Sequence, residues 1–364
     1  MNGHRTIAPR LSLAGVTCLA AGCIVHDSGV RETAGGGAVA AASSAAGNAP
    51  PGYNTTGSPA LPAPPAGGVP RPSGAAGNLT VLDWAGFRAA VTYTFDDANS
   101  SQIQHYAELQ ALGVRMTFYL ITGKTPEFDD PVWQRAVHDG HEVGSHTKSH
   151  RHTGTQADID ASNEAIRQRL GVDAWTMAAP YGDASYIPLA PSRYLINRGV
   201  ANGAIGPNDE TDPFNLFCYI PPAGAKAAAF NAEVDAARGA GKWKTVLVHG
   251  FAGGTDAAYQ AVSIGEFIAA VNHAKSFGDV WIDSMVNVGA YWRAQKMFAT
   301  IAPTTSGNSK TWTWTLPPHF PPGKVLRVRV DGGTLTQPGG RTLAWDDHGY
   351  YEVALDVGSV TLSP

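Results

Sequence analysis

The stretch "AAVTYTFDDANSS", residues 89–101, decides how the chain is interpreted. An apolar, β-branched run ends at Phe95, and two carboxylates, Asp96 and Asp97, follow it directly. Such a run predicts a buried strand. Two like charges at the end of a strand cost free energy unless a cation or a bound proton offsets them. The stretch therefore predicts a strand whose carboxyl end carries a functional site.

Further apolar runs alternate with helical patterns along the chain. The other predicted strands are residues 115–121, 175–181, 244–251 and 279–285. The predicted helices are residues 101–113, 130–140, 156–171 and 263–278. Strands that alternate with helices predict an α/β fold with a parallel sheet.

Composition divides the chain into regions. An Ala-, Gly-, Pro- and Ser-rich segment has too few large apolar residues to offset chain entropy, so we expect a disordered tether. After about residue 300, short alternating runs joined by Gly, Pro and Asp turns predict a small all-β, sandwich-like module. The expected regions are a signal peptide (1–23), the tether (24–78), the α/β domain (79–299) and the β-module (300–364).

Three tryptophans of the β-module have two interpretations. Trp312, Trp314 and Trp345 could line a sugar-binding surface, or they could pack in the module and against the larger domain. Packing is favoured because aromatic side chains in a small β-module are usually structural.

The first 23 residues have the features of a secretory signal. Arg5 and Arg10 supply positive charge, and "LSLAGVTCLAAGC", residues 11–23, supplies a short apolar core. The end of this stretch resembles a bacterial lipoprotein signal, in which Cys23 would be lipidated and attach the mature chain to a membrane; simple cleavage is the alternative. We therefore expect an exported protein of the cell envelope or the extracellular space.

The net charge bears on nucleic-acid binding, and the cysteine content bears on disulfide formation. The 364-residue chain has a formal net charge of −4, which argues against nucleic acid as a partner. Cys18 and Cys23 lie in the signal, so Cys218 alone remains in the mature chain and no intramolecular disulfide can form. Cys218 is expected to be a buried small residue.

The segment "HEVGSHTKSHRH", residues 141–152, is rich in histidine. His146 and His150 are four residues apart, a spacing that puts both imidazoles on one face of a helical turn, as a divalent metal requires. His138, His141 and His152 are alternative ligands. The third ligand would be a carboxylate at the end of an earlier strand. Of Asp96 and Asp97, one could bind the metal while the other acts as general base.

Five motifs, taken in order, resemble those of polysaccharide deacetylases of the NodB-homology type, carbohydrate esterase family 4. They are "TFDD" (94–97), "MTFYLITGK" (116–124), "GHEVGSHTKSH" (140–150), "APYG" (179–182) and "LVH" (247–249). Their order and spacing match the family over roughly residues 87–298. The resemblance implies a distorted (β/α) barrel and metal-dependent removal of acetyl groups from a glycan.

The resemblance also implies a role for six residues. Asp97, His146 and His150 would hold the metal, expected to be zinc (Zn2+), with another divalent transition metal as the alternative. Asp96 would be the general base, His249 the general acid, and Tyr181 would contribute a backbone N–H to the oxyanion site. Such a ligand set leaves coordination positions open, as a catalytic zinc needs.

Two positions depart from the family pattern. Many relatives carry an arginine two residues before the proline of the "APYG" motif, where it pairs with the catalytic aspartate, but this chain has Ala178 there. Lys124, Arg193 or Arg198 could substitute for it.

The aspartate that holds the acid histidine in the family is also not evident. Asp209, Asp212 and Asp283 are candidates, and a surface role is at least as well supported for each. His249 needs a nearby carboxylate to stay protonated near neutral pH.

The function expected from the sequence is N-deacetylation of an N-acetylglucosamine-containing glycan, chitin-like or peptidoglycan-like. That activity would make the protein a hydrolase of linear amide bonds whose partner is an acetylated polysaccharide or oligosaccharide. The alternative within the same enzyme class is an O-acetyl esterase acting on a plant polysaccharide such as acetylxylan. The alternative from another class is a non-catalytic glycan-binding protein on the same barrel.

Overall fold

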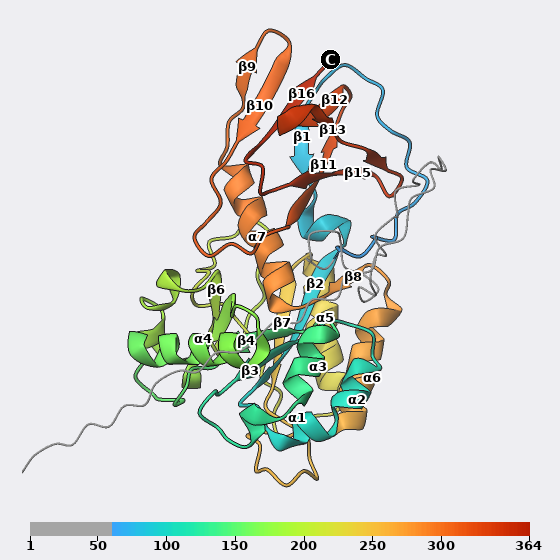
Figure 1. Ribbon diagram of the computed structural model, residues 1–364. Helices are drawn as coiled ribbons and strands as arrows, with labels where there is room; N and C mark the ends of the chain where they lie inside the picture. Colours follow the sequence, from blue (N-terminus) through green and yellow to red (C-terminus); the bar gives the residue numbers. More distant parts are fainter. Residues whose placement is uncertain (1–59) are drawn as a thin grey trace, which may run out of the picture. The chain divides into compact units, whose positions relative to one another are not determined.

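The computed structural model describes residues 60–364, and its central element is a seven-stranded parallel sheet (Figure 1). The strand order is β6-β5-β4-β3-β2-β7, and β8 pairs with the first half of β2. The strands are β2 (Ala89–Asp96), β3 (Thr117–Leu120), β4 (Glu142–Ser145), β5 (Thr176–Ala178), β6 (Ile196–Arg198), β7 (Trp243–Val248) and β8 (Val280–Ile282). All eight residues of β2 are buried, as expected for a parallel sheet that is covered on both faces.

Helices connect these strands and cover the sheet. They are α1 (Ser100–Gln104), α2 (Tyr106–Gln110), α3 (Val132–His138), α4 (Gln156–Leu170), α5 (Ala227–Ala240), α6 (Ile264–Ser276) and α7 (Met285–Ala299). Local sequence sets the ends of α4, because the Thr155 hydroxyl accepts from the backbone of Asp158 and Gly171 ends the helix in the left-handed conformation. The expected α/β fold, a distorted (β/α) barrel, is confirmed.

The predicted elements differ from the observed ones in several places. Residues 101–113 form two short helices that meet at His105 instead of one. Strands β4 and β6 and helices α5 and α7 were not predicted. Cys218 is fully buried, as expected.

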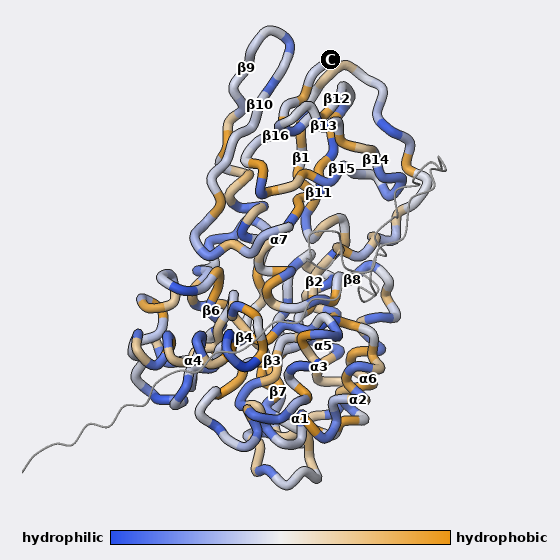
Figure 2. The backbone as a smooth tube through the Cα atoms, in the orientation of Figure 1, coloured by the Kyte–Doolittle hydropathy of each residue, from blue (hydrophilic) through white to orange (hydrophobic). Residues whose placement is uncertain are grey.

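The C-terminal strands form two antiparallel sheets, with orders β1-β11-β15-β14 and β13-β12-β16-β10-β9. Their strands are β1 (Leu79–Val81), β9 (Thr304–Ser306), β10 (Ser309–Thr313), β11 (Val325–Val330), β12 (Thr334–Gln337), β13 (Arg341–Thr342), β14 (Trp345–Asp346), β15 (Tyr350–Ala354) and β16 (Ser359–Ser363). The β9–β10 hairpin is coloured mostly pale, with some blue, in Figure 2, and all three β9 residues are exposed.

The three C-terminal tryptophans have packing roles. Trp312 and Trp314 are buried, and their rings lie 6.5 and 5.9 Å from the ring of Phe298 in α7. Trp345 donates its indole N–H to the carbonyl of Val69 at 2.9 Å. Packing of the β-module, and not a row of exposed tryptophans, therefore explains these residues.

Residues 60–81 differ from the expected tether and domain boundary. Strand β1 pairs with β11 of the C-terminal sheet and not with the barrel strands. The side chain of Asn78 donates to Asp331 at 3.1 Å, and the carbonyl of Pro62 accepts from the buried Arg327 at 2.8 Å. Composition missed this because the segment has only a few large apolar residues, among them Leu61 and Leu79, and much of its binding is through backbone groups and polar side chains.

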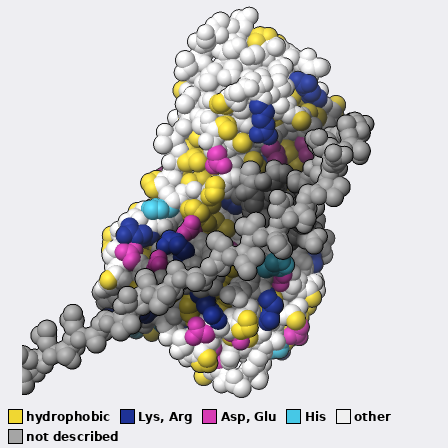
Figure 3. All heavy atoms as spheres, in the orientation of Figure 1, with side chains coloured by type: hydrophobic (Ala, Val, Ile, Leu, Met, Phe, Trp, Pro, Cys, Tyr) yellow, Lys and Arg dark blue, Asp and Glu magenta, His cyan; other side chains and the backbone are white. Residues whose placement is uncertain are grey.

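The remaining N-terminal predictions, the signal (1–23), Cys18, Cys23 and the tether up to residue 59, lie outside the described residues. Within residues 60–364, no helix is both long enough and apolar enough to span a membrane. On the face shown in Figure 3, charged side chains are sparse over the part formed by the C-terminal strands.

Candidate functional site

The two adjacent carboxylates lie where β2 ends in a turn. Asp96 is the last residue of β2 and is 2% exposed. Asp97 and Ala98 both have left-handed backbone conformations, with φ of 75° and 50°. Such conformations are strained for residues other than glycine. The turn directs the two neighbouring side chains to different partners.

The two histidines lie in the loop after β4, and the prediction that they share a helical turn is wrong. Thr147 and His150 have φ of 62° and 49°, so left-handed turns fold the loop back on itself. The ring centroids of His146 and His150 are 4.7 Å apart. The loop therefore brings together two imidazoles that a helical turn was expected to align.

Asp97, His146 and His150 form a cluster that could hold a metal ion. Their ligand atoms all lie within 4.8 Å of one another. His146 Nε2 is 3.4 Å from Asp97 Oδ1, and His150 Nε2 is 3.5 Å from the same oxygen. The Nδ1–H of His146 donates to the carbonyl of Ala178 at 2.8 Å, which leaves Nε2 facing Asp97.

The donor set fits zinc. Asp97 Oδ1 is buried, and no hydrogen-bond partner for it is found among residues 60–364. A buried, unpartnered carboxylate oxygen beside two imidazole nitrogens suits a divalent cation with nitrogen and oxygen ligands.

Charge interactions in the cluster favour an ionised Asp97. Burial opposes its ionisation, but His146 outweighs burial and holds the pKa of that carboxyl well below its usual range. Burial also opposes the charged form of His146, but Asp96 and Asp97 raise the pKa of this imidazole. Burial and the charge on His146 lower the pKa of His150 to about 4.

Asp96 pairs with the guanidinium of Arg198, which is fully buried. Arg198 ends β6, directly opposite Ala178 on β5, so this arginine comes from the strand next to the one that leads into "APYG". Of the other two candidates, Arg193 pairs with Asp160 at the surface, and Lys124 donates to the carbonyl of Asp97. Arg198 therefore supplies the guanidinium that pairs with Asp96, in place of the arginine that many relatives carry at the position of Ala178.

The two carboxylate oxygens of Asp96 differ in their partners within residues 60–364. Arg198 binds Oδ2, which also lies 3.6 Å from His146 Nε2. Asp96 Oδ1 is buried, and no hydrogen-bond partner for it is found in the described part of the chain.

His249 follows β7, but the described residues give it no carboxylate partner. Its Nδ1 is buried and unpartnered within residues 60–364. The three aspartates considered for this role bind elsewhere: Asp209 to Gly206, Asp212 to Phe214 and Asp283 to Arg115. Burial lowers the pKa of His249, and Asp96 and Asp97 only partly oppose this shift.

Tyr181 lies beside the cluster in a turn, with φ of 57°. Its ring centroid is 4.5 Å from that of His150 and 3.6 Å from that of His152, with which it stacks.

The other two histidines lie apart from the cluster. His138 pairs with Asp139 at the surface. His141 accepts from the backbone of Met116 at 3.0 Å, and burial lowers the pKa of His141 to about 4.

Sequence reasoning missed two residues that join the strand ends. The Asn99 amide donates to the carbonyl of His249 at 2.7 Å. The Gln102 amide donates to the carbonyls of Asp96 at 2.5 Å and His249 at 2.7 Å. Their only sequence signal is their position at the start of the helix that follows "TFDD".

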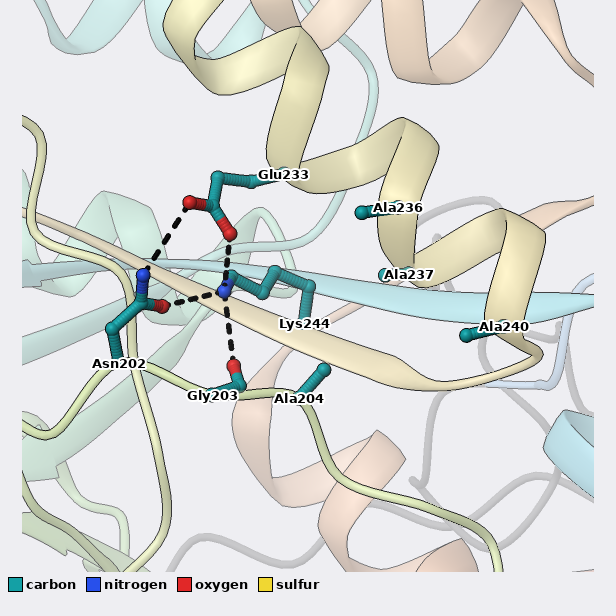
Figure 4. Close-up of a pocket in the computed structure, with 8 residues that line it drawn as sticks. All are labelled: Asn202, Gly203, Ala204, Glu233, Ala236, Ala237, Ala240 and Lys244. Atoms are coloured by element: carbon teal, nitrogen blue, oxygen red, sulfur yellow. Dashed lines mark hydrogen bonds and ion pairs between the residues drawn. The ribbon is translucent and has the colours of Figure 1, made fainter.

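A separate hollow of about 350 Å³ lies near the other end of β7 (Figure 4). The ammonium of Lys244 contacts Glu233 at 2.5 Å, Asn202 at 2.6 Å and the carbonyl of Gly203 at 3.0 Å. These contacts use all three donors of the ammonium, so the hollow offers no free charge to a ligand.

Comparison with known proteins supports one family. Residues 87–191 match the family model described as polysaccharide deacetylase, which confirms the resemblance drawn from the motifs. A gellan lyase from a Bacillus species is 28% identical over 148 residues, which cover 38% of this chain and 6% of the gellan lyase. The chain therefore corresponds to a small part of that protein.

Several solved structures are similar to more than half of this chain. A protein described as a polysaccharide deacetylase from Mycobacterium smegmatis is 17% identical, with a TM-score of 0.43, covering 62% of this chain and 96% of that one. A peptidoglycan N-acetylglucosamine deacetylase catalytic domain from Eubacterium rectale is 17% identical, with a TM-score of 0.39 and coverages of 57% and 92%. A family 4 acetyl xylan esterase from Clostridium thermocellum is 16% identical, with a TM-score of 0.36 and coverages of 55% and 89%.

Proposed function

Because residues 87–191 match the polysaccharide deacetylase family, we propose that this protein is a metal-dependent hydrolase that removes acetyl groups from a polysaccharide. The preferred substrate is an N-acetylglucosamine-containing glycan, chitin-like or peptidoglycan-like. One observation supports the proposal most strongly: Asp97, His146 and His150 converge, and the ion-paired Asp96 lies beside them.

The metal ligands and Asp96 would have different roles in the attack of water on the acetyl group. A divalent metal held by Asp97, His146 and His150 would supply an activated water and polarise the acetyl carbonyl. Arg198 fixes Oδ2 of Asp96, so Oδ1 is free to accept the proton of the attacking water.

Two further residues would stabilise the oxyanion and protonate the leaving group. The backbone N–H of Tyr181 would stabilise the oxyanion of the tetrahedral intermediate. His249 would donate a proton to the departing sugar amine or hydroxyl as the bond to the acetyl group breaks.

O-acetyl ester hydrolysis is a second candidate because of one observation. The Nδ1 atom of His249 has no carboxylate partner among residues 60–364, so the described chain does little to keep this imidazole protonated. An alkoxide leaves more readily than an amine and depends less on a strong general acid. An acetylated xylan-like polysaccharide would suit such a site.

Acetate release from a substrate panel tests the proposal. The panel contains chitooligosaccharides, peptidoglycan fragments and acetylated xylan, each with chelator and with chelator followed by zinc. Release that chelator stops and zinc restores supports the proposal, and the substrate that responds identifies an amide or an ester. Protein that contains zinc but releases no acetate from any of them would favour the glycan-binding alternative.

Export is part of the same proposal, since such glycans lie outside the cytoplasm. Membrane attachment through a lipidated Cys23 remains a proposal based on the signal alone. A Cys23→Ser variant that stays in the membrane fraction would contradict it.

A further inference from the structure

The described residues contain two aromatic side chains that are largely exposed, and both lie at the candidate site. Tyr181 is 53% exposed and Tyr259 is 60% exposed. Tyr181 contacts His150, and Tyr259 contacts His249 at a ring-centroid distance of 5.1 Å and an interplanar angle of 86°. Exposed aromatic side chains beside a polar site are a feature of ligand contacts.

A third exposed apolar residue lies beside Tyr181. A side chain built on Gly182 would lie 2.2 Å from Val200, so Val200 packs directly against the turn that carries Tyr181. Val200 is 39% exposed. Only one other large apolar residue in the described chain is this exposed, Val357 in the turn between β15 and β16.

Tyr259 belongs to a loop that is anchored to the barrel. The loop joins β7 to α6 and approaches α1 (Figure 1). Asp256 accepts from the backbone of Ser101 at 2.8 Å and from the hydroxyl of Ser100 at 3.1 Å. The backbone of the buried Phe251 donates to the Ser101 hydroxyl at 3.0 Å.

The base of the loop is closed as well. The backbone of Ala252 donates to the carbonyl of Val262 at 2.8 Å. Gln260, next to Tyr259, has φ of 49°, a strained conformation that is held in place by the loop around it. The structure therefore holds Tyr259 against His249 while the residue stays largely exposed to solvent.

The proposed chemistry indicates what would contact that surface. In deacetylation the leaving group is the amine or hydroxyl of the sugar itself, so the sugar ring must lie beside the residue that protonates it. In this chain that residue would be His249, and Tyr259 is the exposed aromatic side chain in contact with it. The apolar C–H face of a pyranose ring is suited to stacking on such a ring.

We propose that Tyr259 is a binding platform for a pyranose ring, on which the sugar that carries the acetyl group, or its direct neighbour in the polymer, stacks. This inference rests on the proposed function. It gives Tyr259 a role in recognising the glycan and none in the chemical step.

Substrates with and without a sugar test the platform. For Tyr259→Ala, Tyr259→Phe and wild type, kcat/KM is measured on the active acetylated oligosaccharide and on ethyl acetate. The ratio of glycan to ethyl acetate kcat/KM should fall about tenfold in Tyr259→Ala, mainly through KM, as expected for losing one aromatic stacking contact. Tyr259→Phe should restore the ratio, and Val357→Ala, the matched exposed control, should leave it at the wild-type value.

Two results would overturn the inference. An unchanged ratio with both activities lowered would mean that Tyr259 merely supports His249, and an unchanged glycan activity would mean that no sugar stacks there. If Tyr259→Ala does not fold, Asp256→Ala, which removes the oxygen that accepts from Ser100 and Ser101, should lower the same ratio.

Calorimetry separates this inference from the proposed function. If wild-type protein releases no acetate at all, binding of chitopentaose and of acetylated xylopentaose is measured instead. Binding of either one that weakens about tenfold in Tyr259→Ala and returns in Tyr259→Phe supports the platform alone. Equal binding in all three proteins, or no binding of either oligosaccharide, contradicts it.

Discussion

Asp96 and Asp97 are neighbours in sequence but have opposite environments. Left-handed backbone at Asp97 and Ala98 directs the Asp97 carboxylate to two histidines, while Asp96 pairs with a buried arginine. The sequence predicted different roles for the two carboxylates, metal ligand and general base, and these roles stay predictions. It could not choose the arginine, because a pairing between β2 and β6 spans 102 residues and depends on the order of strands in the sheet.

Replacing Arg198 tests the support of Asp96. Arg198→Met leaves the buried Asp96 carboxylate without its partner, so the variant should lose about 3–5 kcal/mol of unfolding free energy. Its kcat for acetate release should fall by about a hundredfold because Asp96 is no longer held in place. Urea denaturation and steady-state kinetics measure the two effects.

Arg193→Met is the matched control, since Arg193 forms an exposed pair with Asp160. Its stability should change by about 1 kcal/mol or less. Equal effects of the two substitutions would contradict the assignment of Arg198.

Zinc affinity should depend on pH because His146 must lose a proton before it can bind the metal. Asp97 has a pKa below its usual range and the pKa of His150 is about 4, so both are deprotonated at neutral pH. The pKa of His146 is raised, so a proton there competes with the metal. Zinc affinity should therefore weaken as pH falls through a value above 6.5, the ordinary histidine pKa.

Calorimetry in buffers of different ionisation enthalpy checks this expectation. Below the His146 pKa, binding should release about one proton per zinc. Release of two protons would mean that His150 is also protonated in the metal-free protein.

At the scale of elements, hydrophobic runs predicted strands well, and histidine spacing predicted the conformation of the loop after β4 poorly. The long buried run of β2 leaves little choice of structure, whereas β4 is four residues long and contains a glycine. A four-residue histidine spacing fits a helical turn, but Thr147 and His150 achieve the same approach in a left-handed loop. Helix α7 escaped prediction because ten of its residues are buried, so no polar face marks it.

Gln102 should stabilise the junction of β2 and β7. Gln102→Leu removes the donors to the carbonyls of Asp96 and His249, and the variant should lose about 1–3 kcal/mol. Thermal denaturation measures the loss. Gln168→Leu, an exposed change on α4, should shift stability by about 0.5 kcal/mol or less; a similar loss there would show that the junction has no special importance.

At the scale of the whole molecule, composition misjudged where the folded part begins. Residues 60–81 contain few large apolar side chains, yet they supply a strand and several backbone carbonyls to the C-terminal sheets. No local pattern shows these contacts, because their partners lie about 250 residues further along the chain, as Asn78 and Asp331 do. The barrel was predictable because its motifs and its hydrophobic strands indicate the same fold.

Arg327 should hold the 60–78 segment in place. It is buried and donates to the carbonyls of Pro62 and Ala85. Arg327→Met should lower stability by about 2–4 kcal/mol and make residues 60–78 sensitive to proteases. Arg341→Met, an exposed change in β13, is the control; equal protease resistance of both variants would contradict this role.

Metal content and acetate release, measured together on two neighbouring variants, test the central claim most directly. Asp97→Asn should lose zinc and activity together, because Asp97 would be a ligand. Asp96→Asn should keep about one zinc per chain and lose activity, because Asp96 would be the base. Full zinc occupancy in Asp97→Asn, or wild-type turnover in Asp96→Asn, would contradict the assignment of these two carboxylates.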